Sequence, residues 1–333
     1  MKAAYFFAAG PPEVLQYGDL PTPEPGPRQV RVRVAAASLN PIDTYLRGGL
    51  AGGAGPGPTI TGRDFAGTVD AIGSGVNQVK VGDRVWGANQ GSGGRPGAFA
   101  EYTVAGEDWV YPLPSGVDEK DAAAVALVGV TAHLGLFLRA GLQAGETVFV
   151  NGGTGGVGSM VVQMAKAVGA KVITTAGSEE KVALAKSLGA DVVVNYKTGD
   201  VTQTVKDATG GAGVDVWYET VPPTDFDKTI DLMAPRGRIV VMAGRAARPA
   251  FPNGPFYVKG LSMLGFAMFN YTAAELRACA DEINKWLVAG KLKPTIGKVF
   301  PLSEAVAAHR LQEENTLHKA GTLSGKIVVT VGG

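Results

Sequence analysis

Residues 147–158 read TVFVNGGTGGVG, a short apolar run that leads into a glycine-rich turn. The run TVFVN predicts a buried strand, and residues 157–168 have the spacing of a helix. In a turn from strand to helix, Gly153 would allow the sharp bend, Gly155 would let the backbone approach a diphosphate, and Gly158 would let helix and strand pack closely. The stretch therefore predicts a dinucleotide-binding turn, with the anion at the N-terminus of the helix.

Outward from this turn, apolar strand-like runs alternate with segments of helical spacing. That rhythm is typical of an α/β fold with a parallel, doubly wound sheet. The expected strands are residues 146–151, 171–175, 191–195, 214–219, 238–242 and 260–266, and the further helices between them are 179–188, 201–209 and 224–233.

The first 122 residues or so are mostly β. The opening MKAAYFF predicts a first strand, and QVRVRVA at residues 29–35 alternates as a half-buried strand does. Shorter strand-like segments are expected at residues 67–71, 82–86, 99–104 and 109–113, a pattern typical of a Greek-key or barrel-like domain. The glycine-rich residues 48–58 predict a mobile surface segment. The tail predicts helices at residues 273–289 and 303–312 and a strand at 325–331, and local pattern leaves its domain open.

Composition excludes several classes of function. With 31 Lys and Arg against 30 Asp and Glu, the net charge of +1 gives no electrostatic reason to expect nucleic acid or an anionic membrane as a partner. The single cysteine, Cys279, excludes a disulfide framework and a multi-cysteine zinc cluster. No apolar run is expected to reach the roughly 18 residues that a membrane helix needs. The default expectation is a cytoplasmic protein.

The end of the second strand of the α/β part indicates which dinucleotide would bind. An NAD site usually carries an acidic residue there, whereas this chain reads TTAG at residues 174–177. Ser178 can donate a hydrogen bond and Lys181 can supply a positive charge, which suits a 2′-phosphate. Glu179 and Glu180 fit this only if they face outward on the first turn of the next helix, whose N-terminus they would favour. NADPH is the expected cofactor.

No metal site is expected. Cys279 lies on an apolar helix face and is interpreted as a small buried hydrophobe. His133 lies in the apolar approach to the first strand of the α/β part, and His309 and His318 lie in a polar tail. None of the three stands in a triad pattern, so all are interpreted as structural or solvated.

Four segments together resemble the medium-chain dehydrogenase/reductase superfamily: NPIDTYLR at residues 40–47, GRDFAGTV at 62–69, GDRV at 82–85 and NGGTGGVG at 151–158. In detail they are similar to its zinc-free quinone oxidoreductase branch, the zeta-crystallin-like enzymes. The zinc-bearing members have a Gly-His-Glu motif where this chain has Gly62, Arg63 and Asp64. The resemblance implies a GroES-like β-rich catalytic domain of residues 1–122 and 267–333, and a Rossmann NADPH-binding domain of residues 123–266.

The resemblance also implies roles for individual residues. Asn40 would lie beside the nicotinamide and Tyr45 would line the substrate cleft, as the two catalytic residues. The implied cofactor-binding residues are Thr131, Gly153, Thr154, Gly155, Gly156, Val157, Gly158, Ser178, Lys181, Tyr196, Gly244, Phe266 and Lys326. In the plainer interpretation, Asn40 and Asp43 cap a Pro-containing turn, and Arg63 and Asp64 form a structural ion pair.

Three functions fit these observations. The favoured one is hydride transfer from NADPH to a quinone without zinc. The alternatives are an NADPH-dependent reductase of activated C=C bonds in enals or enones, with Tyr45 or Tyr257 as a candidate proton donor, and a non-catalytic NADPH-binding crystallin-like protein. A homodimer is expected, because residues 258–268 would form an apolar strand at the exposed edge of the sheet.

Overall fold

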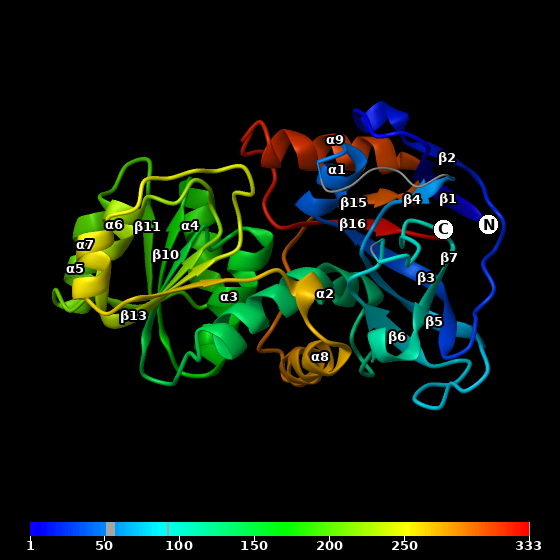
Figure 1. The fold of residues 1–333 in the computed structure, drawn as a ribbon, viewed down its shortest axis with the longest axis horizontal. Helices are drawn as coiled ribbons and strands as arrows, with labels where there is room; N and C mark the ends of the chain where they lie inside the picture. The colour runs from blue at the N-terminus through cyan, green and yellow to red at the C-terminus, as the bar shows by residue number, and fades with distance from the viewer. Residues whose placement is uncertain (51–56, 92, 333) are drawn as a thin grey trace. The chain divides into compact units, whose positions relative to one another are not determined.

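The computed structural model describes residues 1–50, 57–91 and 93–332, so the centre of the predicted glycine-rich segment at 48–58 lies outside the described residues. The chain divides into two compact units (Figure 1). Unit 1 comprises Met1–Leu127 and Thr272–Gly333, and unit 2 comprises Val128–Tyr271. An α/β fold with a β-rich part and a parallel-sheet part is confirmed.

Unit 1 is built on a seven-stranded sheet in which the long strand β3 is central. The order is β15 (Ile296–Pro301), β16 (Lys326–Thr330), β3 (Gln29–Leu39), β5 (Asp64–Ile72), β6 (Arg84–Gly87) and β8 (Tyr111–Pro112), with β7 (Tyr102–Gly106) also paired to β3. A smaller sheet has the order β2 (Gln16–Asp19), β1 (Lys2–Phe6), β4 (Thr59–Ile60). The predicted first strand is confirmed, whereas the strand expected at 99–104 begins only at Tyr102.

The C-terminal tail belongs to the same sheet as the N-terminal strands. β16 pairs antiparallel with β3, so that Val328 lies opposite Ser38, and β15 pairs parallel with β16. Apolar residues of β3, β5, β16 and helix α9 (Ala305–Thr316) pack into one core. The predicted helix at 273–289 is confirmed as α8 (Ala273–Val288). Burial against β3, which local periodicity does not report, therefore places the tail.

One long helix was not predicted. Helix α2 (Glu119–His133) continues into a π-helical segment, Leu134–Arg139. Together they form 21 residues that are long and apolar enough to cross a membrane, which corrects the expectation that no such run exists. Most of these residues are buried within the protein, as in the core helix of a globular fold.

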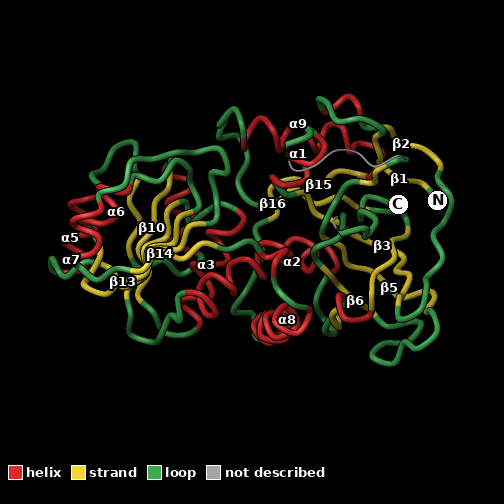
Figure 2. The backbone as a smooth tube through the Cα atoms, viewed as in Figure 1, coloured by secondary structure: helices red, strands yellow, loops and turns green. Residues whose placement is uncertain are grey.

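Unit 2 is a six-stranded parallel sheet with helices between its strands (Figure 2). The order is β11 (Val192–Asn195), β10 (Lys171–Ala176), β9 (Thr147–Asn151), β12 (Val214–Glu219), β13 (Met233–Val241) and β14 (Ser262–Gly265). Numbered along the chain within this unit, that order is 3-2-1-4-5-6, the doubly wound order of dinucleotide-binding domains. The helices are α3 (Gly156–Ala167), α4 (Glu179–Ser187), α5 (Val201–Thr209), α6 (Phe226–Asp231) and α7 (Asn253–Val258).

Three expected elements of unit 2 differ in extent. Helix α6 is shorter than the predicted 224–233, because it begins only after Asp225, whose carboxylate accepts the Lys228 N–H. Strand β13 begins at Met233 and not at 238; its pairing with β12 is interrupted between Val214 and Val216, which accommodates the residues around Pro235. The strand expected at 258–268 contains only β14, because Val258 ends helix α7.

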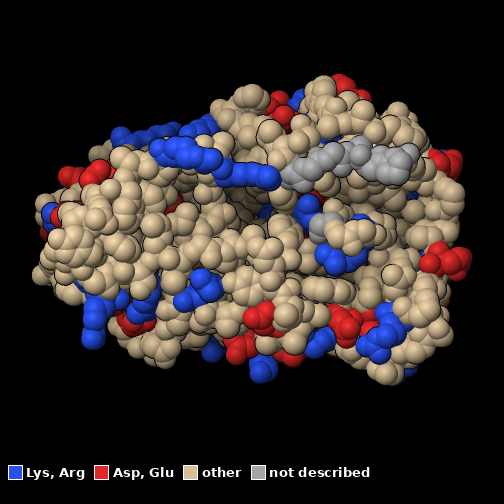
Figure 3. Space-filling view, viewed as in Figure 1, with Lys and Arg blue, Asp and Glu red and all other residues tan. Residues whose placement is uncertain are grey.

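Charged side chains are sparse on the face of the molecule that Figure 3 shows. On the face that Figure 3 shows, most of the area is uncharged, and acidic and basic side chains both occur. The near-equal numbers of the two charge types agree with this view.

Candidate functional site

The glycine-rich turn of unit 2 joins the carboxyl end of β9 to the start of α3. Gly152 has a φ of +84°, so Gly152, and not Gly153 as predicted, adopts the left-handed conformation. Gly155 is the N-cap of α3, in extended backbone with φ −73° and ψ 170°, and it is exposed. The first N–H groups of a helix have no partner within it, so the turn presents donors and a positive dipole end at an exposed position.

Each glycine of the motif is required for a different reason. A Cβ on Gly153 would lie 2.1 Å from Thr174 Oγ1, and a Cβ on Gly158 would lie 2.2 Å from the Gly152 carbonyl oxygen. The fold itself therefore requires glycine at both positions. A Cβ on Gly155 would meet only the Gly152 carbonyl oxygen, at 3.4 Å, which is an ordinary contact. The missing side chain at Gly155 leaves open backbone, as the close approach of a diphosphate would require.

The other residues predicted in this turn line the same segment. Thr154 is buried, while Gly156 and Val157 are half-buried in the first turn of α3. The dipole and the donors of this 12-residue helix suit an anion. The residues present fit a dinucleotide diphosphate.

The expected 2′-phosphate residues lie at the carboxyl ends of β10 and β11. Ser178 caps α4 and its Oγ accepts the Lys181 N–H at 3.3 Å. Tyr196 is 57% exposed, and its hydroxyl would lie 2.6 Å from a Cβ on Gly177, so the ring covers the end of β10. Glu179 accepts a hydrogen bond from Asn195 Nδ2 at 2.7 Å. The structure therefore brings Ser178, Lys181 and Tyr196 to one edge of the sheet.

The remaining predicted residues of unit 2 are dispersed. Thr131 is buried in α2, and its carbonyl accepts a hydrogen bond from Tyr218 Oη at 3.0 Å. Gly244 follows β13 with a φ of +84°, against Pro222. Phe266 follows β14, edge-on to Tyr271 with centroids 6.3 Å apart.

In unit 1, the expected Pro-containing turn at residue 40 is the start of helix α1 (Pro41–Arg47). Pro at the first helical position and an acceptor at the third favour a helix start: Asp43 Oδ2 accepts the Asn40 N–H at 2.9 Å. Tyr45 is half-buried on this helix, and burial raises its pKa. Asn40 is fully buried at the N-cap.

The side chain of Asn40 joins a buried network with Lys326 and Asp64. Lys326 Nζ donates to Asn40 Oδ1 at 2.6 Å and to the Leu39 carbonyl at 2.7 Å, and lies 3.9 Å from Asp64 Oδ2. Asn40 Nδ2 donates to Asp64 Oδ2 at 2.8 Å. The oxygen and the nitrogen of the Asn40 side-chain amide therefore both have hydrogen-bond partners. The Lys326 ammonium donates to a backbone carbonyl and a side chain of unit 1 itself.

Asp64 is the centre of this network, and its partners come from segments distant in the sequence. Its carboxylate also accepts from Ser38 Oγ at 2.7 Å, while Arg63 Nε lies 3.7 Å from Asp43 Oδ1. Arg63 Nη1 also donates to the Gln90 carbonyl at 3.1 Å, so the guanidinium of Arg63 contacts residues beyond its neighbour in sequence. Burial raises the pKa of Asp64 and lowers that of Lys326.

The histidines and the cysteine of the described residues do not form a candidate metal site. Within residues 1–50, 57–91 and 93–332, no three side chains of His, Cys, Asp or Glu meet as a candidate metal centre. Cys279 is buried, which raises its pKa to about 12. His309, predicted to lie in a polar tail, is fully buried, and its ring lies edge-on to Phe99.

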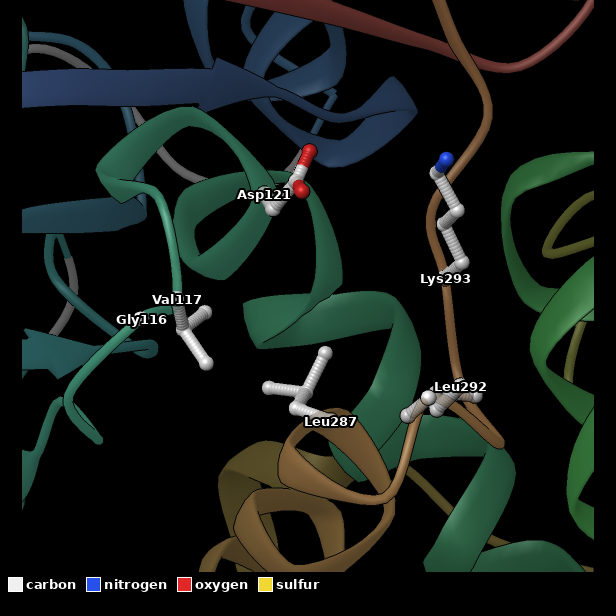
Figure 4. A pocket seen from close by; sticks show the side chains of 7 residues that line it. Gly116, Val117, Asp121, Leu287, Leu292 and Lys293 are labelled. Carbon is white, nitrogen blue, oxygen red and sulfur yellow. The ribbon is translucent and has the colours of Figure 1, made fainter.

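A pocket of about 160 Å³ in unit 1 contains none of the predicted site residues (Figure 4). Asp121 and Lys293 supply its charged groups. Burial raises the pKa of Asp121.

Two family models match the chain: the alcohol dehydrogenase GroES-like domain over residues 26–115, and the zinc-binding dehydrogenase over residues 156–285. The quinone oxidoreductase of Pseudomonas aeruginosa is 38% identical over 316 residues, covering 92% of this chain and 94% of the relative. That of Sus scrofa is 35% identical over 330 residues, covering 99% and 97%. The chain belongs to the quinone oxidoreductases of the medium-chain dehydrogenase/reductase superfamily. It is an oxidoreductase, and the family resemblance seen in the sequence is confirmed.

Other similar proteins bind or act on different molecules. A structure of the Escherichia coli quinone oxidoreductase complexed with NADPH has a TM-score of 0.87 and 29% identity, over 99% of this chain and 100% of that one. An NAD-dependent alcohol dehydrogenase has a TM-score of 0.88 and 34% identity, over 100% of both chains. A 2-haloacrylate reductase from a Burkholderia species is 32% identical, over 93% of this chain and 95% of the relative.

Proposed function

We propose that this quinone oxidoreductase family member reduces a quinone with NADPH, without zinc. The observation that carries the proposal is the pairing of an open glycine turn at Gly155 with Ser178 and Lys181 after β10, where Gly177 and Ser178, and not an acidic residue, directly follow the strand. The α3 N-terminus would hold the diphosphate, and Lys181, Ser178 and Tyr196 would hold the 2′-phosphate. The NADPH-bound E. coli relative supports this assignment.

The nicotinamide end is assigned to the other predicted residues. Thr131, Gly244 and Phe266 would contact the nicotinamide half of the cofactor from unit 2. In unit 1, Asn40 would act beside the ring and Tyr45 would line the acceptor site. The resemblance implies a direct cofactor contact for Lys326; because its ammonium is held by Asn40 Oδ1 and the Leu39 carbonyl, we propose instead that it orients the Asn40 amide.

The chemistry asks little of the protein beyond binding and orientation. When bound, NADPH would supply the hydride. Asn40, fixed by its two partners, and the aromatic face of Tyr45 would keep an apolar acceptor in a reactive arrangement. A quinone disperses the developing negative charge itself, and its product phenolate can take a proton from solvent. A simple aldehyde would need an electrophile to stabilise an alkoxide, so it would be a poor substrate.

The testing experiment measures kcat/KM for a panel of quinones and a panel of enals and enones, with NADPH and with NADH. We expect quinone turnover, with NADPH preferred by tenfold or more, about 1.4 kcal/mol. Tyr45→Phe should lower quinone turnover by well under tenfold, because packing survives. Alkenal reduction without quinone activity, reduced about 100-fold by Tyr45→Phe, would instead assign the C=C reductase function.

The cofactor assignment has its own control. Lys181→Ala should weaken NADPH binding and leave NADH binding nearly unchanged, whereas Lys186→Ala, an exposed lysine of the same helix, should change neither. Equal losses for both cofactors in Lys181→Ala would overturn the 2′-phosphate assignment. Dissociation constants from fluorescence titration give the comparison.

The second candidate function is the reduction of activated C=C bonds, which the relative named 2-haloacrylate reductase favours. The third, NADPH binding without catalysis, predicts cofactor affinity but no turnover with either panel.

We also propose that activity resists chelators, that the protein is cytoplasmic and binds no nucleic acid, and that the functional domains are residues 1–122 with 267–333, and 123–266. Stoichiometric zinc together with inactivation by a chelator would contradict the first of these.

A further inference from the structure

Three polar side chains at the carboxyl ends of neighbouring strands of unit 2 form one hydrogen-bonded chain. They are Glu219 on β12, Asn151 on β9 and Thr175 on β10. Asn151 Nδ2 donates to Glu219 Oε1 at 2.9 Å, and Thr175 Oγ1 donates to Asn151 Oδ1 at 2.8 Å. The chain thus crosses three adjacent strands, at the edge where the glycine-rich turn begins.

The chain ends on the backbone of that turn. Gly152 N donates to Thr175 Oγ1 at 2.9 Å, and Gly153 N donates to the Thr175 carbonyl at 3.3 Å. Because the Thr175 hydroxyl proton points to Asn151, a lone pair is left for the Gly152 N–H. Every bond from Gly152 to Glu219 runs in the same donor-to-acceptor direction, an arrangement in which the bonds polarise one another.

The Glu219 carboxylate is the last acceptor of the chain, and it also accepts hydrogen bonds from other groups. It is 3% exposed, and besides Asn151 its carboxylate accepts from Trp217 Nε1 at 3.1 Å and from Val221 N at 2.7 Å. A buried carboxylate is costly unless such donors surround it. Burial raises its pKa, while these three neighbours oppose the shift.

We propose that Glu219, Asn151 and Thr175 are positioning residues that hold the Gly152 turn in its diphosphate-binding shape, and so determine NADPH affinity. The proposal rests on the proposed cofactor. Gly152 is the residue with positive φ in the turn, and its N–H donates to the Thr175 side chain and not to a backbone carbonyl of the neighbouring strand. A turn ordered before binding loses less conformational entropy when the ligand arrives.

The decisive variant is Thr175→Val, which keeps the shape of the side chain and removes the hydroxyl. Its control is Thr174→Val on the same strand. The Thr174 hydroxyl donates to the Val150 carbonyl and its side chain packs against Gly153, so this variant measures how packing against the turn matters when the Gly152 hydrogen bond is kept. Thr175→Ser restores the hydroxyl and should restore wild-type behaviour. Glu219→Gln tests the far end of the chain.

Two readouts are needed. In the protein without cofactor, hydrogen exchange of the peptide containing Gly152 should be about tenfold faster in Thr175→Val and in Glu219→Gln than in wild type. Fluorescence titration should show NADPH binding five- to tenfold weaker, and KM for NADPH should rise while kcat is nearly unchanged. Thr175→Ser should match wild type in both readouts, and Thr174→Val should change both by less than Thr175→Val does.

The outcomes separate the two proposals. Unchanged exchange and NADPH affinity in Thr175→Val would overturn the positioning role while leaving the proposed function intact. Wild-type protein that binds no NADPH would overturn the proposed function, and the exchange of Gly152 would still report on the chain. If Thr175→Val does not fold, Glu219→Gln with the same two readouts decides the question.

Discussion

His309 is a titratable residue of unit 1 that has no contact with solvent. Its Nε2 lies 3.4 Å from Thr61 Oγ1. Burial, with a smaller contribution from the nearby Arg47 guanidinium, lowers the pKa of His309 to about 3. The folded protein therefore holds this imidazole neutral through the mildly acidic range.

This burial predicts an acid-sensitive stability term. Between about pH 6.5 and 3 the unfolded chain binds a proton at His309 and the folded protein does not, so stability is lost as the pH falls, approaching about 1.4 kcal/mol per pH unit. His309→Gln removes this term. Urea unfolding at several pH values from 7.5 to 5 should show the free-energy difference between wild type and His309→Gln shrinking by that slope.

Asp43 changes stability with pH in the opposite direction to His309, so its contribution must cancel in the comparison between wild type and His309→Gln. Burial raises the pKa of Asp43 to about 6, so its contribution is present at low pH and is lost as the pH rises from about 4 through 6. Since both proteins carry Asp43, the difference between them isolates His309. The same substitution at the exposed His318 is the control. A difference that does not vary with pH would contradict the prediction.

At the scale of one element, the glycine-rich turn contains glycines that are required for two different reasons. Gly153 is required because Thr174 occupies the space of a side chain, whereas Gly155 faces open space. A sequence motif treats both alike, and the structure distinguishes them by what a Cβ would meet.

The two glycines should therefore respond differently to alanine. Gly153→Ala should destabilise the protein by about 2 kcal/mol or more, because a Cβ 2.1 Å from Thr174 Oγ1 forces the turn or β10 to move. Gly155→Ala should change stability by less than about 1 kcal/mol but weaken NADPH binding about tenfold, because the methyl group occupies the diphosphate's approach. Thermal unfolding and fluorescence titration measure the two effects. Equal stability losses would refute this distinction.

For the whole molecule, we propose a homodimer that forms through the exposed edge of the unit 2 sheet. β14 is the last strand of the unit 2 sheet, and Met263 on it is 43% exposed. An exposed apolar edge strand favours pairing with a second copy.

We expect light scattering at micromolar concentration to give twice the mass of one chain. Met263→Lys should shift the protein toward the monomer, because a charge on the pairing edge opposes association. Val299→Lys, on the edge strand β15 of the unit 1 sheet, is the matched control and should leave the mass unchanged. A monomeric wild-type protein would end the proposal.

Local pattern was sufficient for the architecture of unit 2. The alternation of strands and helices and the glycine turn at residues 151–158 predicted the doubly wound sheet, which is confirmed. These features succeed because hydrophobic period and turn chemistry act within a few residues. The roles of Asn40, Tyr45 and the cofactor-binding residues remain predictions, since they depend on molecules that bind the chain.

Contacts between distant segments were decided by the tertiary structure alone. Asp64 meets Lys326, and Asn40 meets both, because β16 returns to pair with β3. The chain from Glu219 to Gly152 likewise exists only because β12 and β10 flank β9. Sequence determined which segments become strands and helices, through local period and propensity. The packing of remote segments set which buried polar groups form hydrogen bonds with one another. An unpaired buried polar group destabilises the fold, and its partner lies in a segment far away in the sequence, where local pattern gives no information.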